Sequence, residues 1–241
     1  MAIICREHGL LFLMAPRTGC TAIGSVLMEE LGGEWLPHED LLDKNGLFVV
    51  QKKHCTLQQL LQHNLLTEQE RKQLVTFTAV RNPFDSLVSL YYKLHRGYQE
   101  ELDDPDSWVY KVPGYADDLK LVRNMTFDQW INRFYPDLPF HLQNRPMNKA
   151  RSLARRLMGR QVQVEDSFVQ GVDHVMRFEQ LQDDFSRVLK AAGVQNPPVI
   201  PKINTTKARS GKDYRSLYTP KTRRKVEVYK EGVLKAFGYA F

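Results

Sequence analysis

The chain has 241 residues, of which 42% are hydrophobic and 26% charged, and 34 Lys and Arg against 28 Asp and Glu give a formal net charge of +6. This composition excludes a disordered or fibrous protein, and the length suits one large α/β domain or two small ones. The positive excess permits an anionic partner, which can be nucleic acid, anionic lipid, an acidic glycan or a phosphate-rich cofactor.

The first predicted unit is a strand, a glycine-containing loop and a helix. The apolar run 10–15 indicates a buried strand, and residues 3–5 can pair with it through a turn at His8-Gly9. The loop 16–21 (PRTGCT) follows, and a helical pattern then runs to Gly32. Such a loop presents free backbone N–H groups and the positive end of a helix dipole, which favours an anion. An ordinary strand–turn–helix joint with a solvated Arg17 is an equal alternative.

A short strand is predicted over 47–50. It ends in the basic stretch 52–54 (KKH), and Thr56 can cap the helix that follows. The spacing of Thr67 and Glu70 then predicts a capping box for a further helix.

The clearest strand signal in the chain is Val75–Val80 (VTFTAV), which leads into Arg81 and an apolar helix. Ser89 lies eight residues after Arg81, about two turns into that helix. Ligands of open α/β sheets bind outside the carboxyl ends of the strands, so Arg81 and Ser89 can hold a negatively charged group. The alternative is a strand-end arginine that pairs with Asp85.

The remaining chain continues the alternation of helices and strands. The expected elements are an irregular aromatic region 98–125, a helix from Thr126, a basic helix 148–158, a strand 172–178, a helix 180–192, a basic loop 202–215 and a last helix from Thr219 to Gly238. Strands that alternate with helices predict an α/β fold with a mainly parallel sheet. No linker divides the chain, so we expect one domain over 1–241.

Two of these segments together resemble the PAPS-dependent sulfotransferase family, where PAPS is 3′-phosphoadenylyl sulfate. Residues 16–22 are similar to the family's 5′-phosphosulfate loop, and 77–92 to its 3′-phosphate motif, in which an arginine is followed eight positions later by a serine. Residues 177–185 and 237–241 resemble the family's later RFE-x-L-x-x-DF stretch and its C-terminus. The segment VRNPFDSLVSLYY and the pair Lys53-His54 resemble the carbohydrate-sulfotransferase branch and its small bacterial relatives most.

The resemblance implies a P-loop-NTPase-like fold and transfer of a sulfuryl group from PAPS to a hydroxyl of a glycan or glycolipid-like acceptor, with PAP as the other product. An acceptor-binding insertion is expected around 98–160. The cofactor-binding residues that the resemblance implies are Arg17, Thr18, Gly19, Cys20, Thr21, Ala22, Arg81, Ser89, Lys207 and Arg209. No metal is required, because the transferred group carries less charge than a phosphate.

His54 is the expected general base, because it follows the strand predicted over 47–50, which would place it at the same edge of the central sheet as the cofactor, and because it precedes a helix cap. His38 and Glu39 are the alternative bases. Arg17 stands where the family has a lysine, and it keeps the charge that stabilises the leaving bridge but donates a proton less readily. Lys52 and Lys53 either strengthen the positive field at this site or are solvated.

Several readings compete with this one. A P-loop-type kinase would need the Walker lysine and a Mg²⁺-binding aspartate, which are not evident, and a nucleic-acid-binding module has only the charge in its favour. A non-catalytic PAP- or nucleotide-binding protein also fits. Two groups can serve an acceptor or have a structural role: the basic set Arg151, Arg155 and Arg156, and the aromatic set Trp108, Tyr110 and Tyr115.

The location expected for the protein is the cytoplasm. No apolar run approaches the roughly 18 residues of a membrane span, and no secretory signal is recognisable. The three cysteines are odd in number and lack paired metal spacing, which indicates reduced thiols.

Overall fold

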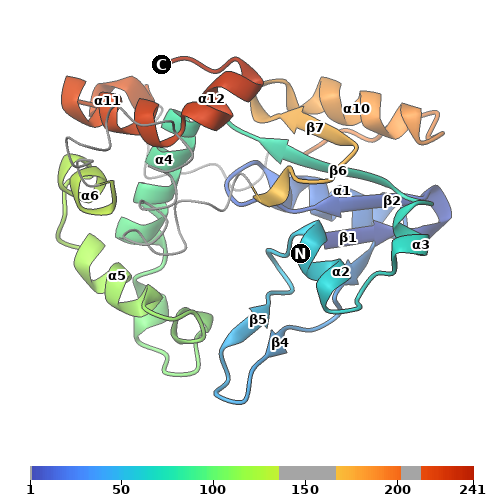
Figure 1. Cartoon of the computed structure of the whole chain (residues 1–241), viewed down its shortest axis with the longest axis horizontal. Helices are drawn as coiled ribbons and strands as arrows, with labels where there is room; N and C mark the ends of the chain where they lie inside the picture. The colour runs from blue at the N-terminus through green and yellow to red at the C-terminus, as the bar shows by residue number, and fades with distance from the viewer. Residues whose placement is uncertain (1, 136–166, 202–212) are drawn as a thin grey trace. The chain divides into compact units, whose positions relative to one another are not determined.

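A computed structural model describes residues 2–135, 167–201 and 213–241 (Figure 1). The chain divides into two compact units, of which the first comprises Met1–Arg81 with Glu165–Thr205 and the second Asn82–Val164 with Thr206–Phe241. The expected helix 148–158 and most of the loop 202–215 lie outside the described residues. The single sulfotransferase domain over 1–241 and the acceptor-binding insertion around 98–160 stay predictions.

The first unit is built on a five-stranded sheet in the order β3-β1-β2-β6-β7. The strands are β1 (Ala2–Cys5), β2 (Leu10–Leu13), β3 (Glu34–Leu36), β6 (Val75–Val80) and β7 (His174–Arg177). β1 pairs antiparallel with both β2 and β3, whereas β2, β6 and β7 are parallel to one another. β1 alone therefore runs against the other four strands, and the predicted mainly parallel α/β sheet is confirmed.

The register of the parallel strands brings their carboxyl ends to one edge. Leu13 pairs with Thr78, and Val80 at the end of β6 pairs with Arg177 at the end of β7. The loop after β2, Arg81 after β6 and Phe178 after β7 therefore all leave the sheet at the same edge, which we call the carboxyl edge.

One face of this sheet is covered by α1 (Cys20–Glu30) and α10 (Leu181–Ala191). Ile23 and Leu27 of α1, and Phe185 of α10, belong to one buried cluster with the sheet residues Phe12 and Phe77, whose rings stack at 5.0 Å. This continuous apolar packing fixes the start of α1 relative to β2, because burial of large side chains is the main stabilising contribution in such a core.

The two short helices that follow begin as the sequence predicts. Thr56 caps α2 (Leu57–Gln62) and Thr67 caps α3 (Glu68–Arg71), each as part of a capping box. The strand predicted over 47–50 forms as β5 (Phe48–Val50), but it pairs with β4 (Leu41–Leu42) in a separate two-stranded sheet. The expectation that this strand joins the central sheet is wrong, because its partner is the short segment just before it in the chain.

The second unit is helical in its described part. Its helices are α4 (Pro83–Tyr92), α5 (Tyr115–Val122), α6 (Phe127–Phe134), α11 (Pro220–Tyr229) and α12 (Glu231–Phe237), with the short turns η2 (Lys93–Gly97), η3 (Glu100–Leu102), η4 (Trp108–Tyr110) and η8 (Tyr214–Leu217). Phe84, Tyr91, Phe127 and Trp130 pack in its buried cluster.

α5 differs from the irregular region predicted over 98–125. Gly114 takes a left-handed conformation (φ 74°) at its start, and the following turns bury Ala116, Leu119 and Val122 on one face. Only three buried apolar residues mark this face, and the exposed Leu121 lies between two of them, so the helical spacing is easily missed.

The end of the chain packs against the start of α4. The Asn82 side-chain oxygen accepts a hydrogen bond from the Phe84 N–H and caps the helix, while its amide nitrogen donates to the Ala240 carbonyl at 2.9 Å. The ring of Phe241 meets that of Phe84 edge-on, with centroids 4.9 Å apart. The cap of α4 is thus held by residues about 160 positions away in the sequence.

Candidate functional site

The loop between β2 and α1 has an unusual backbone. Arg17 and Gly19 both lie in the left-handed region, with φ of 66° and 75°. Glycine adopts this conformation easily, but arginine does not, so Arg17 is strained. The buried Thr18 hydroxyl donates to the Ala15 carbonyl at 2.8 Å and closes the loop on itself. Its single hydrogen is therefore used to shape the loop, and its oxygen remains an acceptor.

α1 starts directly behind this loop. Gly19 is its N-cap and supplies no side chain, so no side-chain hydrogen bond caps the helix. The first backbone N–H groups of an 11-residue helix, together with its dipole, thus face the loop at the carboxyl edge. Cys20 and Ala22, in the first turn, are buried; the side chain of Thr21 hydrogen-bonds Cys20. The Ala22 N–H already donates to the Gly19 carbonyl at 3.0 Å, so the backbone N–H groups of Cys20 and Thr21 are what an anion would meet.

Arg81 joins the loop to the end of β6. Its Nη1 donates to the backbone carbonyl of Arg17 at 3.0 Å, and its guanidinium carbon lies 4.1 Å from the centre of the Phe178 ring. The two predicted phosphate-binding segments are therefore in direct contact through Arg81. Ser89 lies on α4 in the second unit and is 1% exposed.

His54 lies at the end of β2. Its Nδ1 is 2.9 Å from the carbonyl oxygen of Met14, the residue after that strand. A carbonyl only accepts, so Nδ1 carries the hydrogen and Nε2 keeps the lone pair. The reason given for this position from the sequence, a preceding strand in the central sheet, is wrong, because β5 belongs to the other sheet.

The surroundings of His54 keep its imidazole neutral. Burial lowers its pKa to about 3, and the positive charges of Lys53 and Arg17 act in the same direction, against the hydrogen bond to Met14. Lys53 and Arg17 also lower the pKa of the Cys20 thiol, although its burial raises that pKa overall. Both cations therefore act on His54 and on the start of α1, and the field there is positive.

The other predicted residues are placed as follows. His38 and Glu39 are exposed beyond β3 and form no hydrogen bond or ion pair within the described part of the chain. The Lys52 ammonium lies 5.8 Å from the Trp35 ring, and its backbone N–H donates to Asp40. Lys207, Arg209 and the basic set Arg151, Arg155 and Arg156 lie outside the described residues. Among those that are described, no group of His, Cys, Asp and Glu could hold a metal ion.

Phe178 is a site residue that the sequence did not single out. Besides facing Arg81, its ring lies under the loop, since a Cβ on Gly19 would sit 3.4 Å from Phe178 Cε2. Phe178 belongs to the RFE stretch, and it follows β7 as Arg81 follows β6. That position at the end of a neighbouring parallel strand is the signal that could have indicated it.

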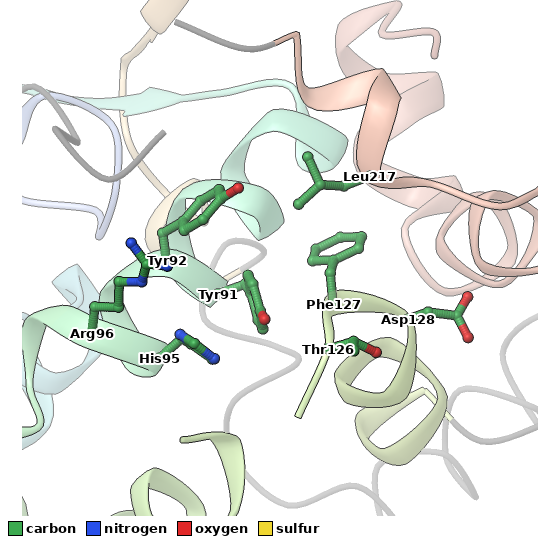
Figure 2. A pocket seen from close by; sticks show the side chains of 8 residues that line it. All are labelled: Tyr91, Tyr92, His95, Arg96, Thr126, Phe127, Asp128 and Leu217. Atoms are coloured by element: carbon green, nitrogen blue, oxygen red, sulfur yellow. The ribbon is translucent and has the colours of Figure 1, made fainter. Parts of the chain in front are cut away.

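A pocket of about 400 Å³ opens in the second unit (Figure 2). Its described lining consists of Tyr91, Tyr92, His95, Arg96, Thr126, Phe127, Asp128 and Leu217. The Tyr91 hydroxyl donates to the Met125 carbonyl, and Asp128 accepts from the Thr219 hydroxyl, so these two polar groups already have partners. Burial, and then the charge of Arg96, lower the pKa of His95. The pocket thus offers aromatic surfaces, a neutral imidazole and one exposed cation.

The aromatic residues predicted either to bind an acceptor or to form a small core do not line this pocket. The Trp108 ring lies between those of Tyr98 and Tyr115, each at 5.1 Å, and packs against the buried cluster of the second unit. The exposed Tyr110 donates its hydroxyl to the Leu102 carbonyl. In the described structure, Trp108 and Tyr115 belong to the core.

A mainly parallel α/β sheet with a glycine loop, a helix start and an arginine at its carboxyl edge is the arrangement in which α/β proteins hold phosphate-like anions. Within that class, this chain belongs to the sulfotransferase family, whose model matches residues 1–239. Neither the curated proteins nor the solved structures include a significant match. The described residues include no helix with the length and apolarity to cross a membrane.

Proposed function

We propose that this transferase uses PAPS as its donor and moves the sulfuryl group to a hydroxyl of a glycan or glycolipid-like acceptor. Membership of the sulfotransferase family makes sulfuryl transfer its reaction in general. The observation that carries the choice of donor is the junction of the loop with Arg81, because one hydrogen bond of 3.0 Å links the two segments suited to a ligand with two anionic ends.

The residues at the carboxyl edge suit such a donor. The start of α1, Arg17 and the backbone from Gly19 to Thr21 would hold the 5′-phosphosulfate, while Arg81, with Ser89, would hold the 3′-phosphate. Lys207 and Arg209 remain proposed contacts of the 3′-phosphate. The donor supplies an activated sulfuryl group, and Arg17 stabilises the negative charge that grows on the bridge as it leaves.

His54 is the proposed base that takes the acceptor's proton at Nε2. The hydrogen bond from Nδ1 to Met14 holds the tautomer in which Nε2 is free, and the low pKa keeps it unprotonated before the reaction. A base with so low a pKa is weak in the free protein. The negative charges of a bound donor oppose Lys53 and Arg17, so they raise the proton affinity of Nε2 when it is needed.

The pocket of the second unit supports a glycan acceptor. Tyr91, Tyr92 and Phe127 present aromatic surfaces, on which the apolar faces of sugar rings pack, and Arg96 suits an acidic substituent (Figure 2).

The donor proposal is tested by thermal unfolding with PAP, AMP or ATP, each with and without magnesium. PAP at 100 times its Kd should stabilise the protein by about 2.7 kcal/mol, and more than AMP or ATP at equal concentration. In Arg81→Ala the advantage of PAP over AMP should disappear. Arg6→Ala is the matched control, because Arg6 is an exposed arginine before β2, at the opposite edge of the sheet.

A lack of any shift with millimolar PAP would refute the donor proposal, and a larger shift with ATP and magnesium would favour a kinase. Labelled sulfate is then followed from PAPS to a panel of neutral and acidic glycans, glycolipids and phenols. PAP binding without transfer to any acceptor would favour a non-catalytic PAP-binding protein.

A further inference from the structure

The turn after β7 packs against two parts of the proposed donor site, Arg81 and the loop at Gly19. η6 (Phe178–Gln180) leads directly into α10, and its first residue, Phe178, is partly buried. The Phe178 ring lies against the Arg81 guanidinium at 4.1 Å, well inside the range of a cation–π contact. The same ring, with Leu181 at the start of α10, lies directly beside Gly19.

The fit at Gly19 is close. A Cβ there would lie 2.9 Å from Leu181 Cδ2 and 3.4 Å from Phe178 Cε2. The backbone of the loop at Gly19 therefore packs directly against the side chains of Leu181 and Phe178. Arg81 completes the arrangement, because its guanidinium carbon lies over the Phe178 ring while its Nη1 donates to the Arg17 carbonyl.

We propose that Phe178 is a positioning residue that holds Arg81 and the loop in their ligand-binding arrangement before the donor arrives. The inference rests on the proposed function, in which Arg81 binds the 3′-phosphate. A free arginine side chain samples many rotamers and loses that freedom when it binds. A ring on one side and a carbonyl at one end remove much of this freedom in advance, so the affinity for the phosphate increases.

Two variants distinguish the effect of the aromatic face of Phe178 from the effect of its side-chain volume. Phe178→Leu keeps an apolar side chain against Gly19 but removes the aromatic face, whereas Phe178→Tyr keeps the face. We expect Phe178→Leu to weaken PAP binding about fivefold, the range of a partly exposed cation–π contact. The affinity for AMP, which lacks the 3′-phosphate, should fall less. Phe178→Tyr should bind PAP as tightly as the wild-type protein does. Titration calorimetry measures all three.

A double-mutant cycle shows whether Phe178 acts through Arg81. In an Arg81→Ala background, Phe178→Leu should cause no further loss of PAP affinity. Tyr98→Leu is the matched control, because Tyr98 lies 4.5 Å from the Lys93 ammonium in the second unit and should leave PAP affinity unchanged. Equal losses with Phe178→Leu in both backgrounds, or none in either, would overturn the proposal.

If the wild-type protein fails to bind PAP, the proposed function fails, and the contact is then judged without ligand. The cycle of Arg81→Ala and Phe178→Leu is repeated on urea unfolding. Non-additive changes in the free energy of unfolding support the positioning of Arg81 by Phe178, and additive changes overturn it.

Discussion

Arg17 combines a charge at the proposed site with a strained backbone. The left-handed conformation costs a residue with a side chain roughly 1–2 kcal/mol, and the loop retains it at this position. The expected benefit is orientation, since the side chain leaves the loop in a direction that an ordinary backbone would not allow.

We therefore predict that Arg17→Gly separates stability from activity. Relief of strain is partly offset by the greater freedom of glycine in the unfolded chain, so the free energy of unfolding should stay equal or rise by up to about 1 kcal/mol. Sulfuryl transfer should fall at least about 100-fold, because a donor to the developing charge is lost. Urea unfolding and the labelled-sulfate assay measure the two effects.

Asn64→Gly serves as the control for this prediction. Asn64 is the other described residue with a side chain at positive φ (54°), and it is exposed after α2. Asn64→Gly should change the free energy of unfolding in the same direction as Arg17→Gly, and it should keep the wild-type rate of sulfuryl transfer. Arg17→Gly with unchanged turnover would remove Arg17 from the catalytic residues.

His54 is expected to affect transfer but not donor binding. A general base contributes about 100- to 10,000-fold, so His54→Ala should lower kcat by at least about 100-fold and leave the Kd for PAP within twofold. His63→Ala, at an exposed histidine that ends α2, should change neither.

The pH profile gives a second measure of His54. Only the neutral imidazole accepts a proton, so kcat/KM for the donor should fall as pH drops through the pKa of the free protein. That pKa is lowered to about 3, so the acid limb should lie well below the ordinary imidazole value of about 6.5. An acid limb near 6.5 that persists in His54→Ala would assign the base to another group.

At the scale of elements, the start of β6 is tied to the segment before β7 by Asp173. Its carboxylate accepts from the Thr76 N–H and hydroxyl, both at 2.8 Å, and pairs with Arg71 at 2.9 Å. Burial raises the pKa of Asp173, but the hydrogen bonds from Thr76 and Arg71 outweigh it and lower the pKa overall. These bonds hold β6 and β7 in the register that places Arg81 beside Phe178.

Asp173→Asn should destabilise the protein by about 1–2 kcal/mol, because an amide offers one oxygen where the carboxylate offers two, and the ion pair is lost. The lowered pKa of Asp173 also predicts how this loss of stability depends on pH. The carboxylate's contribution is present above the unfolded-state pKa and is lost as pH falls through the folded-state pKa, so the variant's deficit should shrink in acid. Chemical unfolding at pH 7 and at pH 3 tests this, and a deficit that grows in acid would contradict it.

Elements were predictable from sequence where a local signal was strong. The apolar runs of β2 and β6, the Thr56 cap of α2, the capping box of α3 and the start of α6 after Thr126 all form as expected. β3 and β4 have three and two residues, too few for a periodic pattern. β5 pairs with β4 across a turn that contains Asn45 and Gly46, the latter at φ 76°. An Asn-Gly pair between two strands is a strong hairpin signal, so this pairing could have been predicted.

At the scale of the whole molecule, the sequence predicted which basic residues follow the strands but not the contacts that position their side chains. Arg17 and Arg81 were predictable as residues after strands. Their hydrogen bond, the contact of Arg81 with the Phe178 ring and the contact of His54 with Met14 join residues between 40 and 97 positions apart, and no local pattern encodes them. The net charge of +6 now has a partial explanation in Arg17, Lys53 and Arg81 near one sheet edge.

The packing of the chain's last residues on α4 affects how the protein should be handled. The Ala240 carbonyl accepts from the same Asn82 side chain that caps α4, one residue after Arg81, and Phe241 packs edge-on against Phe84. An affinity tag fused directly to Phe241, or a carboxypeptidase that trims two residues, would loosen the first turn of α4. Purification handles and fluorescent fusions therefore belong elsewhere, and donor binding is best measured on a preparation that carries no tag at Phe241.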